Sequence, residues 1–332
     1  MKAVSMLNLV PVRAGQTNAE AIGSMVKLAK EAEKLGYARY WIAEHHNTGS
    51  LVSSATQLLI GHTLAHTETI RVGSGGVMLP NHSPLLVAEQ YGTLATIYPN
   101  RVDLGLGRAP GTDQLTAAAL RRNERDVSLN FPDDVRALQR YFGPADKQGY
   151  VKAFPGVGLE VPLYILGSST ESAYLAAELG LPYVFAAHFA PRMLEMAVEI
   201  YRRGFKPSAV LDKPEVIVCL NAIVADSDEE AAYLATSQEQ FFLNVVRNTR
   251  NPLPLPVESM EGVWSHAEEA MVRQMLSESL VGSKESVAKQ LESFQSRLHA
   301  DEVMAVSYIY DEEKQYRSYS LLKEIVSDGC IG

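Results

Sequence analysis

Short apolar segments alternate with helical segments along this chain, and this alternation constrains the fold more than any other feature. Apolar residues recur at helical spacing within Asn18–Leu35, around Ser54–Ala65, and from Ser83 to Pro99. Eight segments have the composition of buried strands: Ala3–Val10, Tyr40–Ala43, Ile70–Gly73, Val102–Leu106, Leu163–Leu166, Tyr183–Ala187, Val216–Val224 and Val303–Val306. Eight β/α units in 332 residues predict one TIM-barrel domain over residues 1–332.

An open, doubly wound sheet is the alternative architecture. That fold usually carries a glycine-rich dinucleotide fingerprint directly after its first strand, and residues 8–14 contain no glycine. The sequence therefore favours the barrel. Two less regular stretches, at about 113–155 and 248–264, interrupt the alternation. They are predicted to be insertions after the fourth and seventh strands.

Composition excludes several classes of protein. The net charge is −9 and no run of basic residues occurs, which argues against nucleic acid or an anionic membrane as a partner. Cys219 and Cys330 are the only cysteines and lie far apart, so a disulfide scaffold is not expected. No apolar stretch reaches the roughly 18–20 residues of a membrane span. These features predict a cytoplasmic protein.

The second strand ends in three ionisable residues, Glu44, His45 and His46. Ionisable groups are seldom buried for stability alone, whereas the C-terminal ends of barrel strands are where catalytic groups gather. Adjacent strand residues point to opposite faces, so His45 and His46 are not expected to chelate one metal ion. No set of residues has metal-ligand spacing, and we predict no metal site. One of the two histidines has a structural role in the alternative interpretation.

Glycines follow the third and fourth strands. Gly75 and Gly76 belong to the first group, and Gly107 and Gly111 flank Arg108 in the second. Such glycines allow a flat ligand to approach the main chain, although a tight turn or strand packing explains them equally well. Arg108 places a cation at the barrel mouth, either for a ligand or for an ion pair with Glu44 or another carboxylate.

The fifth strand ends in Gly167, Ser168 and Ser169, with Ser172 one turn later. Exposed N–H groups at a helix N-terminus, together with hydroxyls, form an anion site suited to phosphate. In the alternative interpretation, Ser168 and Glu171 are simply the capping box of a helix. His188 follows the sixth strand. Together, the strand ends predict a site for a phosphorylated planar cofactor such as flavin mononucleotide (FMN).

Four segments carry a family resemblance, namely residues 40–46, 72–80, 101–111 and 166–182. They resemble the bacterial luciferase-like flavin monooxygenases, and the likeness covers nearly the whole chain with its motifs in order. The phrases GGVMLPNHSP and LGLGRAPG resemble an uncharacterised bacterial subgroup most. The resemblance implies a TIM barrel, commonly dimeric. It also implies reduced FMN supplied by a separate flavin reductase, with O2 as co-substrate in the oxidation of a small organic molecule.

The resemblance also implies residue roles. His45 matches a catalytic histidine, with His46 beside it, and Gly75–Gly76 matches a non-prolyl cis peptide behind the flavin ring. Arg108, Ser169 and Ser172 match phosphate contacts. Ser168 replaces a glutamate that contributes through its backbone, and Gly107 replaces a reactive cysteine. His188 takes the place of a tryptophan beside the ring.

The first hypothesis from sequence is therefore an FMN-dependent, two-component monooxygenase in which Glu44, His45 and His46 are catalytic. The cofactor-binding residues would be Gly75, Gly76, Arg108, Gly167, Ser168, Ser169, Ser172 and His188. The nearest alternative is an oxidoreductase that uses the deazaflavin F420 to transfer hydride. A non-catalytic flavin-binding protein on the same scaffold is the third.

Overall fold

The computed structural model describes residues 3–109, 111–120 and 130–328, and its centre is a closed parallel barrel. The strands are β1 (Ala3–Asn8), β2 (Arg39–Ile42), β3 (Arg71–Met78), β4 (Val102–Gly107), β5 (Leu163–Gly167), β6 (Tyr183–Ala186), β7 (Val216–Ala225), β8 (Leu280–Ser283) and β9 (Glu302–Val306). Strands β1 to β7 pair in chain order up to β6–β7, and β9 closes the ring between β7 and β1. The predicted TIM barrel is confirmed, with β9 as the eighth barrel strand.

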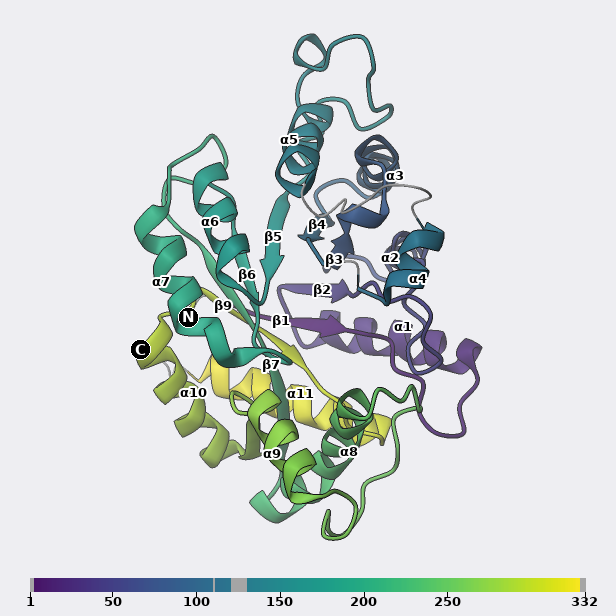
Figure 1. Cartoon of the computed structure of the whole chain (residues 1–332), viewed down its shortest axis with the longest axis vertical. Coiled ribbons are helices and arrows are strands. Elements are labelled where there is room, and N and C mark those ends of the chain that lie inside the picture. The colour runs from purple at the N-terminus through teal and green to yellow at the C-terminus, as the bar shows by residue number, and fades with distance from the viewer. Residues whose placement is uncertain (1–2, 110, 121–129, 329–332) are drawn as a thin grey trace.

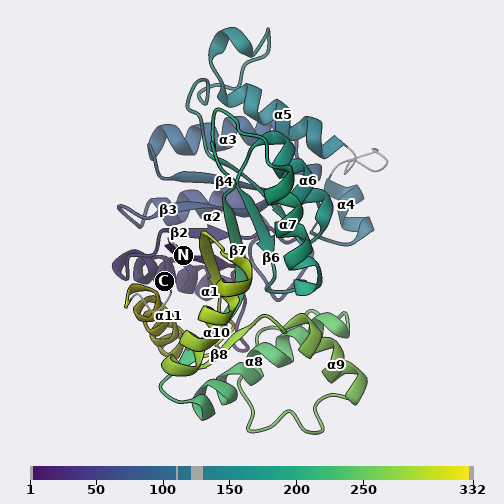
Figure 2. The same ribbon diagram turned by 90° about the vertical axis from the view of Figure 1, so that its left-hand side faces the viewer.

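Helices surround the barrel (Figures 1 and 2). They are α1 (Asn18–Lys34), α2 (Thr56–Leu64), α3 (Pro84–Ile97), α4 (Gln114–Leu120), α5 (Phe131–Phe142), α6 (Thr170–Leu179), α7 (Leu194–Gly204), α8 (Asp228–Val246), α9 (His266–Met275), α10 (Lys284–Leu298) and α11 (Glu312–Ser327). Short 3-10 turns are η1 (Leu79–Asn81), η3 (Ala145–Lys147) and η4 (Pro191–Met193). Helices α8 and α9 lie together at the end of the molecule opposite α5 (Figure 1). No helix in the described ranges is both long and apolar enough to cross a membrane.

Strand alternation divides the core into two layers. On β7, Val216, Val218 and Leu220 pack outward against the helices, whereas Ile217 and Cys219 point into the barrel. The inward layer also contains Trp41, Tyr164 and Met304 from other strands. The barrel interior is thus filled with side chains, as in other TIM barrels, and leaves ligand binding to the strand ends.

A buried ionic network occupies the N-terminal end of the barrel. Asp103, which is fully buried, accepts hydrogen bonds from Arg39 at 3.1 Å, Arg71 at 2.5 Å and the Trp41 indole at 3.0 Å. Glu302 pairs with the other side of Arg39 at 3.0 Å. Burial alone would lower the pKa of Arg39, but Glu302 and Asp103 outweigh it and raise that pKa. The network links β2, β3, β4 and β9 at the N-terminal end of the barrel, opposite the C-terminal ends of the strands.

Strand β3 is longer than predicted. It continues through Gly73–Gly76 to Met78, with a register shift against β4 between Ser74 and Val77. The glycines therefore lie within the strand and not after it. An ideal Cβ on Gly75 would approach Leu7 Cδ1 to 2.5 Å, and one on Gly105 would approach Ser74 O to 2.2 Å. Close packing between strands thus requires these glycines, whatever else they serve.

The region at 113–155 contains a regular helix that the sequence prediction missed. Helix α5 buries Phe131, Val135, Leu138 and Phe142 along one face and packs against α3. It is a member of the outer helix ring. Between α8 and α9, Leu253 is fully buried, and its N–H and C=O groups bond Val12 and Ala14. This part of the second predicted insertion is therefore anchored to the chain that follows β1.

The predicted capping box at Ser168 is wrong. The N-cap of α6 is Ser169, its side chain makes no capping hydrogen bond, and Glu171 lies in the first turn, one residue too early for the box. The other end of α6 is as expected, with Gly180 in the left-handed conformation at φ 60°. The Glu171 carboxylate instead accepts hydrogen bonds from the Ser169 side chain and from its own backbone N–H.

Candidate active site at the barrel mouth

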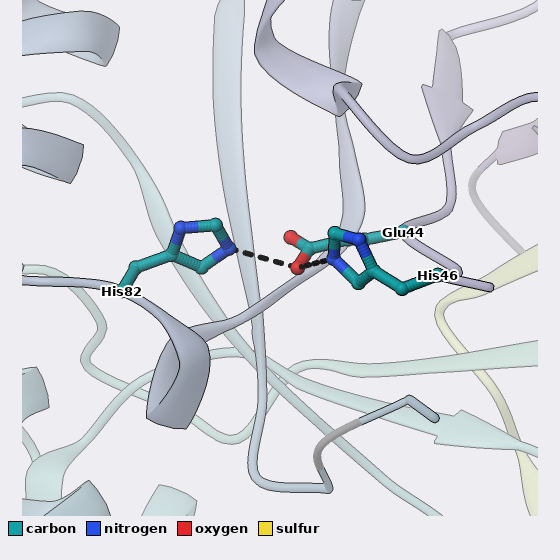
Figure 3. Close-up of side chains that lie close together, drawn as sticks. All are labelled: Glu44, His46 and His82. Atoms are coloured by element: carbon teal, nitrogen blue, oxygen red, sulfur yellow. Dashed lines mark hydrogen bonds and ion pairs between the residues drawn. The ribbon is translucent and has the colours of Figure 1, made fainter. Parts of the chain in front are cut away.

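A buried carboxylate joins two histidines at the C-terminal ends of β2 and β3 (Figure 3). Glu44 follows β2 and has 1% side-chain exposure, and its Oε1 lies 2.8 Å from the Nε2 atoms of both His46 and His82. The Met78 amide, at the end of β3, donates to Oε2 at 3.1 Å. Because the tight turn η1 follows β3 directly, it returns His82 toward the barrel mouth. We call these three side chains the Glu44 cluster.

Electrostatics determine the protonation of this cluster. Burial opposes ionisation of Glu44, but hydrogen bonds from His46, His82 and Met78 outweigh burial and hold the pKa at about 2. The carboxylate is therefore ionised at neutral pH and can only accept hydrogen bonds. Both Nε2 atoms must then carry protons. Each Nε2 N–H thus donates to the Glu44 carboxylate.

The same side chains form a possible metal-ligand set, which the sequence prediction did not identify. One ligand atom from each of Glu44, His46 and His82 lies within 4.8 Å of the others. His82 comes from a different loop, so no sequence spacing marks the group. We interpret the cluster as a hydrogen-bonded unit, because two imidazole N–H groups and the Met78 N–H already engage both carboxylate oxygens.

Substitution of Glu44 by Gln should destabilise the protein by about 2–4 kcal/mol at pH 7, since buried N–H groups lose a charged acceptor. The depressed pKa of Glu44 makes this contribution depend on pH. It is present above pH 4.5, the ordinary value, and is lost as the pH falls through about 2. Urea unfolding of Glu44→Gln and wild type from pH 7 to pH 3 measures the difference. Glu178→Gln, in an exposed pair with Arg136, is the matched control. A difference independent of pH would contradict this account.

His45 forms a hydrogen bond with the Gly111 backbone and is not a member of the Glu44 cluster. Burial lowers its pKa, against a hydrogen bond to the Gly111 backbone and the charge of Glu44, which both raise it. His45 also interacts electrostatically with His188, which follows β6 and is 8% exposed. Burial first and His45 second bring the pKa of His188 down to about 3. Burial is thus the main cause that lowers the pKa of both His45 and His188.

The glycines bring main chain to the same region. The Gly75–Gly76 peptide bond is cis, the configuration that the resemblance implies. An ideal Cβ on Gly107 would lie 2.8 Å from Met78 Sδ, and Gly111 has φ +63°, with Glu44 O 3.2 Å from its ideal Cβ. Gly111 therefore permits the turn that brings its backbone to His45.

The residues predicted to bind phosphate lie near the N-terminus of α6. Arg108 extends from β4 to within 3.7 Å of Glu171, and both side chains are largely exposed, at 43% and 60%. Thus Arg108 pairs with Glu171 and not with Glu44. The N-terminus of α6, the Ser168 and Ser169 hydroxyls, and Arg108 are donors of the kind that bind phosphate, and in this structure Glu171 accepts from Ser169 and pairs with Arg108. Because Glu171 is exposed, it can turn away when another anion takes Arg108.

Ser172 and Gly167 determine the backbone turn at the start of α6. Ser172 is buried, and its hydroxyl donates to Ser169 O at 3.0 Å, so it holds the turn. Its direct contact with a phosphate stays a prediction. An ideal Cβ on Gly167 would lie 1.7 Å from Ser172 Oγ, so no other residue fits at this position without moving Ser172.

If the site takes FMN, as the resemblance implies, replacement of Gly167 by Ala should weaken FMN binding roughly tenfold or more, because the displaced Ser172 no longer holds the turn predicted to bind phosphate. Riboflavin, which lacks the phosphate, should lose less affinity. Flavin fluorescence quenching measures both. Gly23→Ala is the matched control, since its Cβ, on an exposed face of α1, has no neighbour within 4 Å. Equal losses for FMN and riboflavin would remove Gly167 from the phosphate seat.

Sequence analysis missed one polar residue of the barrel mouth, Asn221 on β7. It is 1% exposed, and its Nδ2 donates to the His188 carbonyl at 2.5 Å and lies 3.4 Å from Ser279 Oγ. A signal was present, because Asn221 is the one polar residue within the strand Val216–Ala225. A lone amide inside an apolar strand requires partners that the strand does not supply.

Comparison with known proteins gives concordant matches. The family model described as luciferase-like monooxygenase matches residues 3–300. A luciferase-like monooxygenase of Escherichia coli K12 is 49% identical over 323 residues, 97% of this chain and 96% of the relative. N-acetyl-S-alkylcysteine monooxygenase of Bacillus subtilis 168 is 30% identical over 333 residues, 98% of each chain.

Solved structures share the fold over the whole length. Apo-MsnO8 has a TM-score of 0.88 at 32% identity, covering 98% of this chain and 99% of that one. The oxygenating constituent of 3,6-diketocamphane monooxygenase from Pseudomonas putida, in complex with FMN, has a TM-score of 0.74 at 17% identity, with 99% of both chains covered. An F420-dependent secondary alcohol dehydrogenase has a TM-score of 0.70 at 16% identity, covering 98% of this chain and 99% of that one. The last two likenesses concern the fold alone.

Proposed function

Because the chain belongs to the luciferase-like monooxygenase family, we propose that it is an FMN-dependent, two-component monooxygenase. It would use O2 and reduced FMN from a partner flavin reductase to oxidise a small organic molecule. The observation that supports this proposal is that Arg108 and the N-terminus of α6, which are suited to bind phosphate, lie at the same barrel mouth as the buried His45 and His188.

In this proposal, the residues of the site have separate roles in binding the cofactor and in proton transfer. Arg108, Ser168, Ser169 and the N-terminus of α6 hold the phosphate, with Gly167 and Ser172 keeping the turn in shape. Gly75, Gly76 and His188 border the ring. The bound flavin supplies the redox chemistry with O2. His45, whose pKa is lowered by burial, holds or moves a proton at its imidazole nitrogen, and the ionised Glu44 holds the His46 ring by a hydrogen bond.

The second candidate is F420-dependent hydride transfer, favoured by the fold shared with the F420-dependent alcohol dehydrogenase. Its cofactor would fill the same seat and need no O2. A non-catalytic flavin carrier is the third candidate. The buried Glu44 cluster speaks against it, because storage alone does not require an ionised carboxylate between two imidazoles.

One anaerobic titration separates these candidates. The purified protein is mixed with reduced FMN or reduced F420 without O2, and fluorescence gives each affinity. Aerated buffer and a panel of thioether, terpene and ketone substrates follow, with products detected by mass spectrometry. Binding of reduced FMN and O2-dependent addition of one oxygen atom to a panel member supports the proposal. Binding of F420 alone supports the second candidate, and flavin oxidation without any oxygenated product supports the third.

Assembly and location are also proposed. Leu58 on α2 and Leu86 and Ile97 on α3 are more than half exposed, at 74%, 54% and 59%. Exposed apolar side chains on neighbouring helices support a homodimer through this face. A free, buried thiol at Cys219 suits a reducing compartment and supports a cytoplasmic location.

A further inference from the structure

Asn221 stands in the wall of the barrel mouth that faces the ligand site. Residues 217, 219 and 221 alternate along β7, and Ile217 and Cys219 belong to the inward layer. Asn221 is therefore the next inward side chain toward the C-terminal end of β7. Its main chain pairs with Val306 of β9, so the strand fixes its position.

In the side-chain amide of Asn221, the nitrogen has a hydrogen-bond partner among the described residues and the oxygen has none. Its Nδ2 donates to the His188 carbonyl at 2.5 Å, which fixes the amide orientation because the opposite orientation would set two carbonyl oxygens against each other. Its Oδ1 is buried and has no hydrogen-bond partner among the described residues. A buried acceptor left unpaired is unfavourable, and in native proteins such an atom usually meets water or a ligand.

The adjoining side chain shows the same pattern. His188 Nδ1 is buried without a partner in the described part of the chain. The imidazole is neutral at pH 7 and the Asn221 amide carries no charge, so these two groups suit a neutral N–H better than an ion. In the order of strands around the barrel, β5 leads into the proposed phosphate site. Next to β5 lies β6, which is followed by His188, and next to β6 lies β7, which contains Asn221. A planar ligand anchored at α6 and extending into the mouth would meet these two strand ends.

We infer that Asn221 Oδ1 accepts a hydrogen bond from the imide N–H of the cofactor's pyrimidinedione ring, making Asn221 a cofactor-recognition residue. This inference rests on the proposed function for the presence of such a ring. It does not depend on which candidate holds, because flavins and deazaflavins carry the same imide. The amide thus has two contacts. Nδ2 holds the turn at His188 in place, and Oδ1 accepts the hydrogen bond from the imide N–H of the ligand.

Binding of two flavin probes to two proteins, compared as in a double-mutant cycle, tests the assignment. The probes are FMN and FMN methylated at N3, which lacks the imide proton, and the proteins are wild type and Asn221→Ala. Wild type should bind FMN roughly tenfold or more tightly than N3-methyl-FMN, and Asn221→Ala should bind both alike, having lost the acceptor and gained room for the methyl group. Ser279→Ala is the matched control, since it removes only the 3.4 Å contact to Nδ2 and should keep the preference.

The outcomes are distinct. Equal wild-type affinity for the two probes overturns the inference, and so does a preference that persists in Asn221→Ala. The wild-type comparison needs no variant to fold, and circular dichroism checks Asn221→Ala. If wild type binds neither FMN probe, the proposed function fails, and the same cycle is run with F420 and its N3-methyl form. Failure to bind any of these overturns both proposals.

Discussion

Under the proposed function, replacement of His45 by Ala should lower the rate of substrate oxygenation by about 100-fold or more and leave FMN affinity close to that of wild type. A neutral imidazole at the barrel mouth is suited to proton transfer, and burial keeps the pKa of His45 below its ordinary value of 6.5. Wild-type turnover should therefore decline only on the acid side of pH 6.5, and this acid limb should be missing from the residual activity of His45→Ala. Steady-state rates against pH and fluorescence titration with FMN provide the two measurements.

His266→Ala is the control for this experiment, since His266 is an exposed histidine at the start of α9. It should retain wild-type turnover and the wild-type pH profile. Unchanged turnover in His45→Ala would remove His45 from the chemistry. An equal loss of FMN affinity and rate would instead place it in cofactor binding.

Replacement of Asp103 by Ala should lower the free energy of unfolding by about 3–5 kcal/mol, because it leaves buried guanidinium groups without their carboxylate. Arg39 and Arg71 both bond Asp103, and the Trp41 indole loses its acceptor as well. Guanidinium chloride unfolding followed by tryptophan fluorescence and by circular dichroism measures the effect. Coincident transitions justify a two-state analysis.

The control is Asp133→Ala, which removes an exposed carboxylate 3.0 Å from Arg136. Exposed pairs contribute roughly 0–1 kcal/mol, so this variant should unfold almost like wild type. If Asp103→Ala also cost less than about 1 kcal/mol, the network at the N-terminal end of the barrel would not be a major source of stability.

The barrel could be predicted because its strands are short, apolar and regularly spaced, which is the pattern of buried parallel strands. β8 was missed, since Leu280–Ser283 has four residues, half of them only partly buried. Helix α5 was missed because acidic and basic residues separate its four buried apolar positions, and the whole stretch was taken as irregular. The glycines of β3 were misplaced because packing between strands, not a turn, accounts for them.

Parts of the site were visible and parts were not. Glu44, His45 and His46 adjoin each other at a strand end, so the sequence alone marks them. The contact between Glu44 and His82 depends on the turn η1 and has no sequence spacing to reveal it. The orientation of Arg108 toward Glu171 likewise depends on how β4 lies beside β5 and α6. Such contacts arise from tertiary packing, which no local pattern encodes.

Strand β7 is part of the barrel and also part of a second packed unit that contains β8, α8 and α9. Asn221 is its last residue paired with β9, and Ala222 is its first residue paired with β8. The outer half of β7 leads into α8, which packs against α9 and β8, while the inner half is part of the barrel wall. Strand β7 therefore continues from the barrel wall into the unit formed by β8, α8 and α9, and Asn221 lies at the junction. Substitutions in α8 or α9 are thus connected to the barrel mouth through one strand, although neither helix contributes a residue to the candidate site.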